Sequence, residues 1–164
     1  MKKALAVLLC LILCVSVMAC AKKNEESGES ADAYAVTYNG TELTLGADAA
    51  DVLKKLGEPS FEQEVFDCGE GNSRMCYRYA SLVLYTMKNT EGKETIDQIE
   101  VNDDLVQTEK EIAIGASVTE LEEAHGEPTQ KGNDEWVYTS GQYQMIFDVE
   151  DGKVSGIGLL RKTK

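Results

Sequence analysis

The sequence contains a single histidine, His125, among its 164 residues. No Ser-His-Asp or Cys-His set can be built around one histidine without using Cys68 or Cys76, which we expect to pair with each other. No cluster of metal-ligand residues is seen, and neither Gly-x-Gly-x-x-Gly nor Gly-x-Ser-x-Gly occurs. We therefore expect no catalytic residues, no metal site and no cofactor, and we predict that the protein is not an enzyme.

Basic residues are also scarce. The chain has 16 Lys and Arg against 29 Asp and Glu, a formal net charge of −13, and loss of Lys2 and Lys3 would make it −15. A strongly acidic surface repels nucleic acids and anionic lipid headgroups. We expect no nucleic-acid partner, and solubility is the simplest role for the charge.

No apolar run is long enough to cross a membrane. The run Ala4–Met18 has 15 residues, whereas a spanning helix needs roughly 20. It follows the basic Met1-Lys-Lys, as the hydrophobic region of a signal peptide does. Residues 1–19 are therefore predicted to be a signal peptide.

The sequence Val17-Met-Ala-Cys20 ends that run. It resembles the lipobox of bacterial lipoproteins, usually Leu-(Ala/Ser)-(Gly/Ala)-Cys. The resemblance implies cleavage before Cys20, attachment of lipid to its sulfur, and an extracytoplasmic protein anchored to the bacterial cell membrane. An ordinary secretory signal or an uncleaved anchor is the alternative.

Residues 20–33 are rich in Lys, Asn, Glu, Ser and Gly, and we expect a flexible linker there. Cys10 and Cys14 leave with the signal, so Cys68 and Cys76 remain as an even pair. They flank a turn-rich segment, and an exported protein meets an oxidising environment. We predict a Cys68–Cys76 disulfide, with free buried thiols as the alternative.

One stretch occurs twice at an offset of 69, as Leu43–Pro59 and as Ile112–Pro128. Each copy reads as a strand end, a glycine, a short helix, a second glycine and a proline. Asp48 and Ser117 stand at the N-cap positions, and Ser117 with Glu120 matches a capping box. The identical residues in the two copies are Gly46, Ala47, Gly57, Glu58 and Pro59, and Gly115, Ala116, Gly126, Glu127 and Pro128.

The two predicted helices differ in their apolar faces. Ala49, Val52, Leu53 and Leu56 form one stripe at helical spacing in the first. Glu122 and His125 stand where the second copy would repeat Leu53 and Leu56. We therefore expect Leu53 and Leu56 to be buried, and Glu122 and His125 not to be buried.

Alternating residues predict antiparallel strands around the helices. Asn39-Gly40 predicts a hairpin turn, and Tyr77-Arg-Tyr79 matches Trp136-Val-Tyr138 at an offset of 59. The predicted fold is α+β, with two tandem repeats, residues 34–104 and 105–164, each a short helix packed on an antiparallel β-sheet. The predicted strands are 34–38, 41–45, 61–67, 76–80, 82–88, 95–101, 135–139, 143–149 and 153–160.

This pattern of a Leu-x-Leu-Gly strand end, a short helix, Gly-Glu-Pro and a meander resembles known tandem repeats over about residues 34–162. It is similar to β-lactamase inhibitor proteins and to the small lipoprotein of the outer-membrane β-barrel assembly machinery. A closer resemblance is to uncharacterised lipoproteins of clostridia-like Gram-positive bacteria. The first two families place two helices in each unit, whereas this sequence predicts one.

We predict a lipid-anchored, extracytoplasmic, non-catalytic module that binds a protein partner. Tyr and Trp are favoured in interface hot spots, so we name Tyr77, Tyr79, Trp136 and Tyr138, with Arg74, as partner-binding residues. A tethered inhibitor of a secreted enzyme is one alternative, and an envelope hydrolase is another. A calcium-binding module is a third, through the acidic stretches 102–104 and 148–152, although these lack EF-hand spacing.

Overall fold

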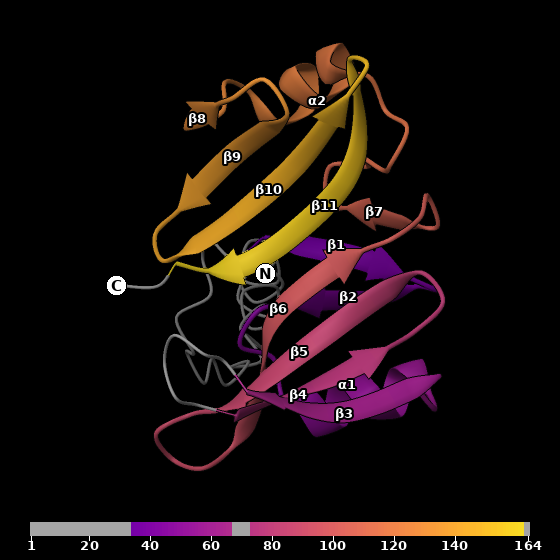
Figure 1. The fold of residues 1–164 in the computed structure, drawn as a ribbon, viewed down its shortest axis with the longest axis vertical. Coiled ribbons are helices and arrows are strands. Elements are labelled where there is room, and N and C mark those ends of the chain that lie inside the picture. Colours follow the sequence, from indigo (N-terminus) through magenta and orange to yellow (C-terminus); the bar gives the residue numbers. More distant parts are fainter. Residues whose placement is uncertain (1–33, 67–72, 163–164) are drawn as a thin grey trace, which may run out of the picture. The chain divides into compact units, whose positions relative to one another are not determined.

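The computed structural model describes residues 34–66 and 73–162. Its fold is α+β, with two short helices and mostly antiparallel strands (Figure 1). No helix in these described ranges is both long and apolar enough to cross a membrane. The elements are β1 (Ala35–Tyr38), β2 (Thr41–Thr44), α1 (Ala49–Leu56), β3 (Phe61–Phe66), β4 (Ser73–Arg78), β5 (Leu82–Lys88), β6 (Glu94–Val101), β7 (Val106–Thr108), α2 (Val118–His125), β8 (Gln130–Lys131), β9 (Glu135–Ser140), β10 (Tyr143–Glu150) and β11 (Lys153–Arg161).

The strands form two sheets. One has three strands in the order β2-β1-β7, and the other has eight in the order β3-β4-β5-β6-β11-β10-β9-β8. In Figure 1 the three-stranded sheet and α1 are seen behind strands of the eight-stranded sheet. The pairing of β6 with β11 and of β1 with β7 joins the two predicted repeat regions into shared sheets.

The central pair of the large sheet is regular. Val101 lies opposite Ile157 and Ile99 opposite Leu159, with the pair Glu100–Gly158 between them. Because opposite residues of an antiparallel pair share a face, the side chains of Ile99, Val101, Ile157 and Leu159 point to the same side.

The predicted local signals hold. The Asn39-Gly40 turn joins β1 to β2, with Tyr38 opposite Thr41 and positive φ at both turn residues. The Asp48 side chain accepts from Asp51 N, and Ser117 and Glu120 form the predicted capping box. Gly57 and Gly126 end the helices at φ of 80° and 78°, values that favour glycine.

Burial of the helices departs from the prediction. The buried residues of α1 are Ala49 and Val52, and Leu121 is the buried residue of α2. Leu53 and Leu56 were predicted to be buried but are only half-buried, because this eight-residue helix presents a narrow apolar stripe to the sheet. His125 is half-buried too, since its ring packs 5.3 Å from Phe147. Glu122 is exposed and His125 is not fully buried, as expected for both.

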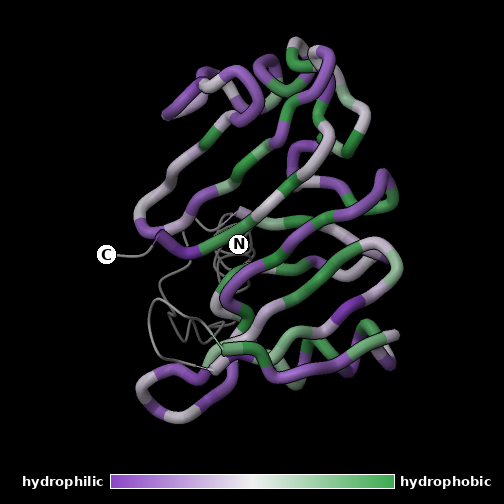
Figure 2. Tube along the Cα trace, viewed as in Figure 1, coloured by the Kyte–Doolittle hydropathy of each residue, from purple (hydrophilic) through white to green (hydrophobic). Residues whose placement is uncertain are grey.

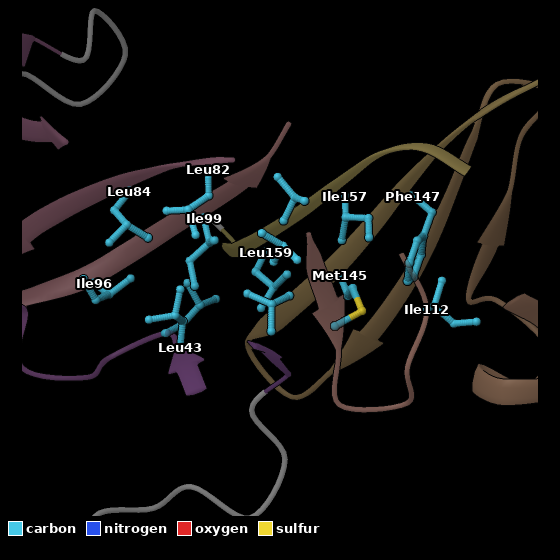
Figure 3. Close-up of a cluster of buried hydrophobic side chains, with 14 of the residues drawn as sticks. Leu43, Leu82, Leu84, Ile96, Ile99, Ile112, Met145, Phe147, Ile157 and Leu159 are labelled. Carbon is cyan, nitrogen blue, oxygen red and sulfur yellow. The ribbon is translucent and has the colours of Figure 1, made fainter. Parts of the chain in front are cut away.

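The core lies between the eight-stranded sheet on one side and the three-stranded sheet with both helices on the other. Figure 3 shows Leu43 of β2 near Ile99, and Met145 near Ile157 and Leu159. Green apolar stretches alternate with purple polar ones along several strands in Figure 2, as expected for sheets with one face in the core. The largest fully buried side chains are Val36, Leu43, Leu82, Leu84, Ile96, Ile99, Val106, Leu121, Met145, Phe147, Val154 and Leu159.

The two helix-containing segments make matching hydrogen bonds. Gly46 N donates to Ile96 O at 2.7 Å, and Gly115 N donates to Val154 O at 2.8 Å. Two tyrosine hydroxyl groups also make matching hydrogen bonds in the two segments. Tyr79 Oη donates to Gly57 O and Tyr138 Oη donates to Gly126 O, each at 3.1 Å.

Candidate functional site

The eight-stranded sheet has two unlike faces. Its inner face carries the core, against which both helices and the three-stranded sheet pack. We call the other side the open face and define it by the residues that the strand registers place there. These residues are Arg74, Cys76, Val83, Tyr85, Gln98, Glu100, Val137, Gln144, Ile146, Gly158 and Leu160.

Four of the predicted partner-binding residues lie on the inner face instead. Tyr77 and Tyr79 are each 7% exposed, and Trp136 and Tyr138 are each 5% exposed. They pack in the core cluster and do not form the exposed aromatic surface predicted from the sequence. Alternation along a strand fixes which residues share a face, but only packing decides which face is buried.

Arg74 does reach the open face, where Gln98, Asp97 and Tyr85 contact it. Its Nη1 lies 3.2 Å from Gln98 Oε1 and 3.5 Å from Asp97 Oδ2. The guanidinium also stands 5.2 Å from the centre of the Tyr85 ring, within cation–π range. Packing and ion pairing together fix the position of this cation.

The polar network continues away from Arg74. Gln98 Nε2 donates to Glu100 Oε1 at 2.8 Å, and Tyr85 Oη donates to Glu100 Oε2 at 3.5 Å. Burial and then the Glu100 carboxylate raise the pKa of Tyr85. The phenol therefore stays protonated and remains a donor at neutral pH.

Apolar side chains continue the open face across the second half of the sheet. Ile146 and Leu160 are half-buried, and Val83 and Val137 are buried beside them. The register places Leu160 opposite Gln98, and Val83 opposite Glu100. A mixed apolar and ordered polar surface thus runs across β5, β6, β11 and β10.

Tyr85, Ile146 and Leu160 were not among the partner-binding residues predicted from the sequence. Each belongs to a strand with apolar residues on both faces, so alternation alone does not tell core from surface. Arg74 could have shown which face is which. In β4, the side chains of Arg74, Cys76 and Arg78 alternate with those of Met75 and Tyr77, so a charged residue at position 74 indicates that Met75 and Tyr77 lie on the core face.

The predicted disulfide is not supported. Cys76 is a free, buried thiol, on the open face of β4 opposite Gln63 and Tyr85. Cys76 therefore matches the alternative of a free buried thiol. Cys68 and the predicted lipidation residue Cys20 lie outside the described residues.

Of the acidic stretches considered for calcium, residues 102–104 lie in a loop, and residues 148–152 cover the end of β10 and the turn after it. Within residues 34–66 and 73–162, no group of three or more His, Cys, Asp or Glu side chains is placed to hold a metal ion. Asp148, Glu150 and Asp151 line a shallow depression with Asp134. Gly156 makes room there for the Asp148 carboxylate, since a Cβ would come 2.5 Å from it.

Comparison with known proteins adds little. No family model and no curated protein matches the chain. A solved chain described as a DUF4309 family protein (YjgB) from Bacillus subtilis subsp. subtilis str. 168 is similar at 16% identity and a TM-score of 0.42. The similarity covers 71% of this chain and 79% of that one. A likeness at this level carries no conclusion about function.

Proposed function

We propose that the protein is a lipid-anchored, extracytoplasmic module that binds a protein partner through the open face. The observation that carries this proposal is the mixed character of that face. Half-buried Tyr85, Ile146 and Leu160 lie beside a positioned Arg74, on a sheet whose helices all pack on the other side.

The composition of the open face suits protein recognition. Interface cores are enriched in aromatic residues and Arg and depleted of Lys and Glu. Arg74 is held before binding by Gln98, Asp97 and Tyr85, so little side-chain entropy is lost when a partner docks. The partner we expect presents apolar side chains opposite Leu160 and Ile146, and a carbonyl or carboxylate near Arg74.

We also propose that the fold consists of two tandem units related by a pseudo-twofold axis. The equivalence of Ile99 with Ile157 and of Val101 with Leu159 makes their cross-strand pairing symmetric about Glu100–Gly158. The pairing of β1 with β7 has the same symmetry. At an offset of 69, Thr37 is equivalent to Val106 and Tyr38 to Gln107, and Thr37 pairs with Gln107 as Tyr38 pairs with Val106. A paired arrangement supports the open face by making one continuous sheet from two small units.

The anchor is supported by sequence alone. The lipobox-like Val17–Cys20 and the polar residues 21–33 suit a tether that leaves the folded residues free in front of the membrane. Replacing Cys20 with Ser should release the protein into the medium or leave the signal uncleaved. Equal incorporation of labelled palmitate by the Cys20→Ser protein would refute the anchor.

A photo-activated cross-linker in intact cells tests the binding face. Placed at Gln144 on the open face, it should give one discrete adduct. Placed at Glu123, exposed on α2, it should give none, because α2 lies on the opposite side of the sheet. Equal adducts from both positions, or none from Gln144, would contradict the proposed face.

A further inference from the structure

A cavity of about 570 Å³ opens at one end of the strands β3 to β6, next to the Arg74 end of the open face. Its size is within the range of small-molecule sites. Met75 and Met87 supply apolar lining, and Tyr77, Thr86 and Glu94 supply the polar groups. Glu64, Ser73, Arg74 and Lys88 complete the lining.

The Glu94 carboxylate is held in place by two hydroxyl groups. Tyr77 Oη donates to Glu94 Oε1 at 3.3 Å, and the Thr86 hydroxyl donates to the same oxygen. Thr86 is 1% exposed and Glu94 is half-buried. Burial and the Glu94 charge raise the pKa of Tyr77 to about 12, so the phenol remains a donor. Among the described residues Glu94 Oε2 has no hydrogen bond, which leaves it able to accept one from a ligand.

The second half of the fold has other residues at the positions of this polar cluster. The strand registers identify the equivalent positions. Tyr77 lies opposite Leu84, and its equivalent Trp136 lies opposite Phe147. Thr86 lies opposite Ile96, and its equivalent Val149 lies opposite Val154.

Thr95, which follows Glu94, bridges to Asp48, and Lys153, which follows Gly152, bridges to Ser117. The positions of Tyr77, Thr86 and Glu94 are thus taken by Trp136, Val149 and Gly152. The second half therefore forms the same strand arrangement without a carboxylate at the position of Glu94.

We propose that this cavity binds a small organic cation, a primary ammonium carrying a short apolar chain. Glu94 accepts the ammonium, and Met75 and Met87 contact the apolar chain, since thioethers adapt to varied shapes. The face of Tyr77 is a second attraction for a cation. Of the basic lining residues, Arg74 is ion-paired with Asp97 on the open face, and Lys88 is exposed at the rim. The cavity shares Arg74 with the open face, but Glu94, Met75 and Met87, which would contact the ligand, are not open-face residues.

Methionine methyl groups report on the cavity directly. In the purified full chain labelled at methionine methyls, titration with butylammonium should shift the Met75 and Met87 signals. Met145 is fully buried in the core and should not shift. Butyrate and 1-butanol should leave all three unchanged, because neither carries a positive charge.

Four variants complete the test. Glu94→Gln should weaken butylammonium binding by at least about tenfold, the usual effect of losing a charged hydrogen-bond partner. Thr86→Val, which copies Val149, should weaken it several-fold and keeps the test valid if Glu94→Gln fails to fold. Lys88→Gln should strengthen it, and Glu91→Gln in the neighbouring turn should leave it unchanged. Absence of Met75 and Met87 shifts in the wild type, or equal shifts with butyrate, would overturn the proposal.

Discussion

At the scale of single residues, His125 occupies a position that the repeat gives to Leu56 in the first helix. Its ring lies 5.4 Å from the Tyr138 ring and 5.3 Å from the Phe147 ring, and Nε2 stands 3.2 Å from Thr108 Oγ1. Burial, and then nearby Lys110, lower the pKa of His125 from 6.5 to about 4. The folded protein therefore keeps this ring neutral at pH values where an unfolded chain protonates it.

This difference makes stability depend on pH. Because the pKa of His125 is lower in the folded state, its contribution is complete above 6.5 and is lost as the pH falls from 6.5 toward 4. Allowing for the partial exposure of the ring, we expect a loss of roughly 1–2 kcal/mol across that window. His125→Leu should remove this part of the loss, as measured by urea unfolding at several pH values. An identical pH dependence in both proteins would argue against a neutral buried ring.

At the scale of elements, the helices contribute through their buried positions. Leu121 is fully buried, and Val52, its counterpart in the first helix, is 5% exposed. Leu121→Ala should lower the free energy of unfolding by about 2–5 kcal/mol. Leu53→Ala should cost clearly less, because Leu53 is only half-buried. Chemical denaturation of both variants decides the order, and a larger loss at Leu53 would contradict it.

Elements with strong local signals could be predicted from the sequence. Both helices, their caps and the Asn39-Gly40 hairpin were found because each depends on residues within one or two turns. The two-residue strand β8 carries no such signal, and β4 starts at Ser73, three residues before its predicted beginning. The pairing of β6 with β11 could not be predicted, since it joins residues far apart in the chain.

The candidate site was less predictable than the fold. Arg74 lies half-buried on the open face, and its role in binding stays a prediction, whereas Tyr77, Tyr79, Trp136 and Tyr138 lie in the core. Aromatic residues suit both cores and interfaces, so residue type alone does not separate the two. The register of the whole sheet was needed to assign them.

At the scale of the whole molecule, the proposed tandem units should respond alike to matched changes. Tyr79 and Tyr138 make the same phenol-to-carbonyl hydrogen bond in the two halves, at 3.1 Å. Tyr79→Phe and Tyr138→Phe should each lower the free energy of unfolding by roughly 0.5–1.5 kcal/mol. Thermal or urea unfolding measures both. A loss confined to one variant would count against structural equivalence of the units.

The central claim is that the open face binds a protein partner. The partner recovered by cross-linking at Gln144 can be purified and titrated with the full chain by calorimetry. A matched pair of variants then separates the open face from the rest of the surface. One is Leu160→Asp, on the open face, and the other is Leu105→Asp, at a loop residue that is 66% exposed.

Placing a carboxylate in the apolar part of an interface leaves an unpaired buried charge. Leu160→Asp should therefore weaken binding at least about tenfold, while Leu105→Asp should leave the affinity unchanged. Both proteins should melt within a few degrees of the wild type, since neither leucine belongs to the core cluster. Equal affinities for the Leu160→Asp protein and the wild type would contradict the account.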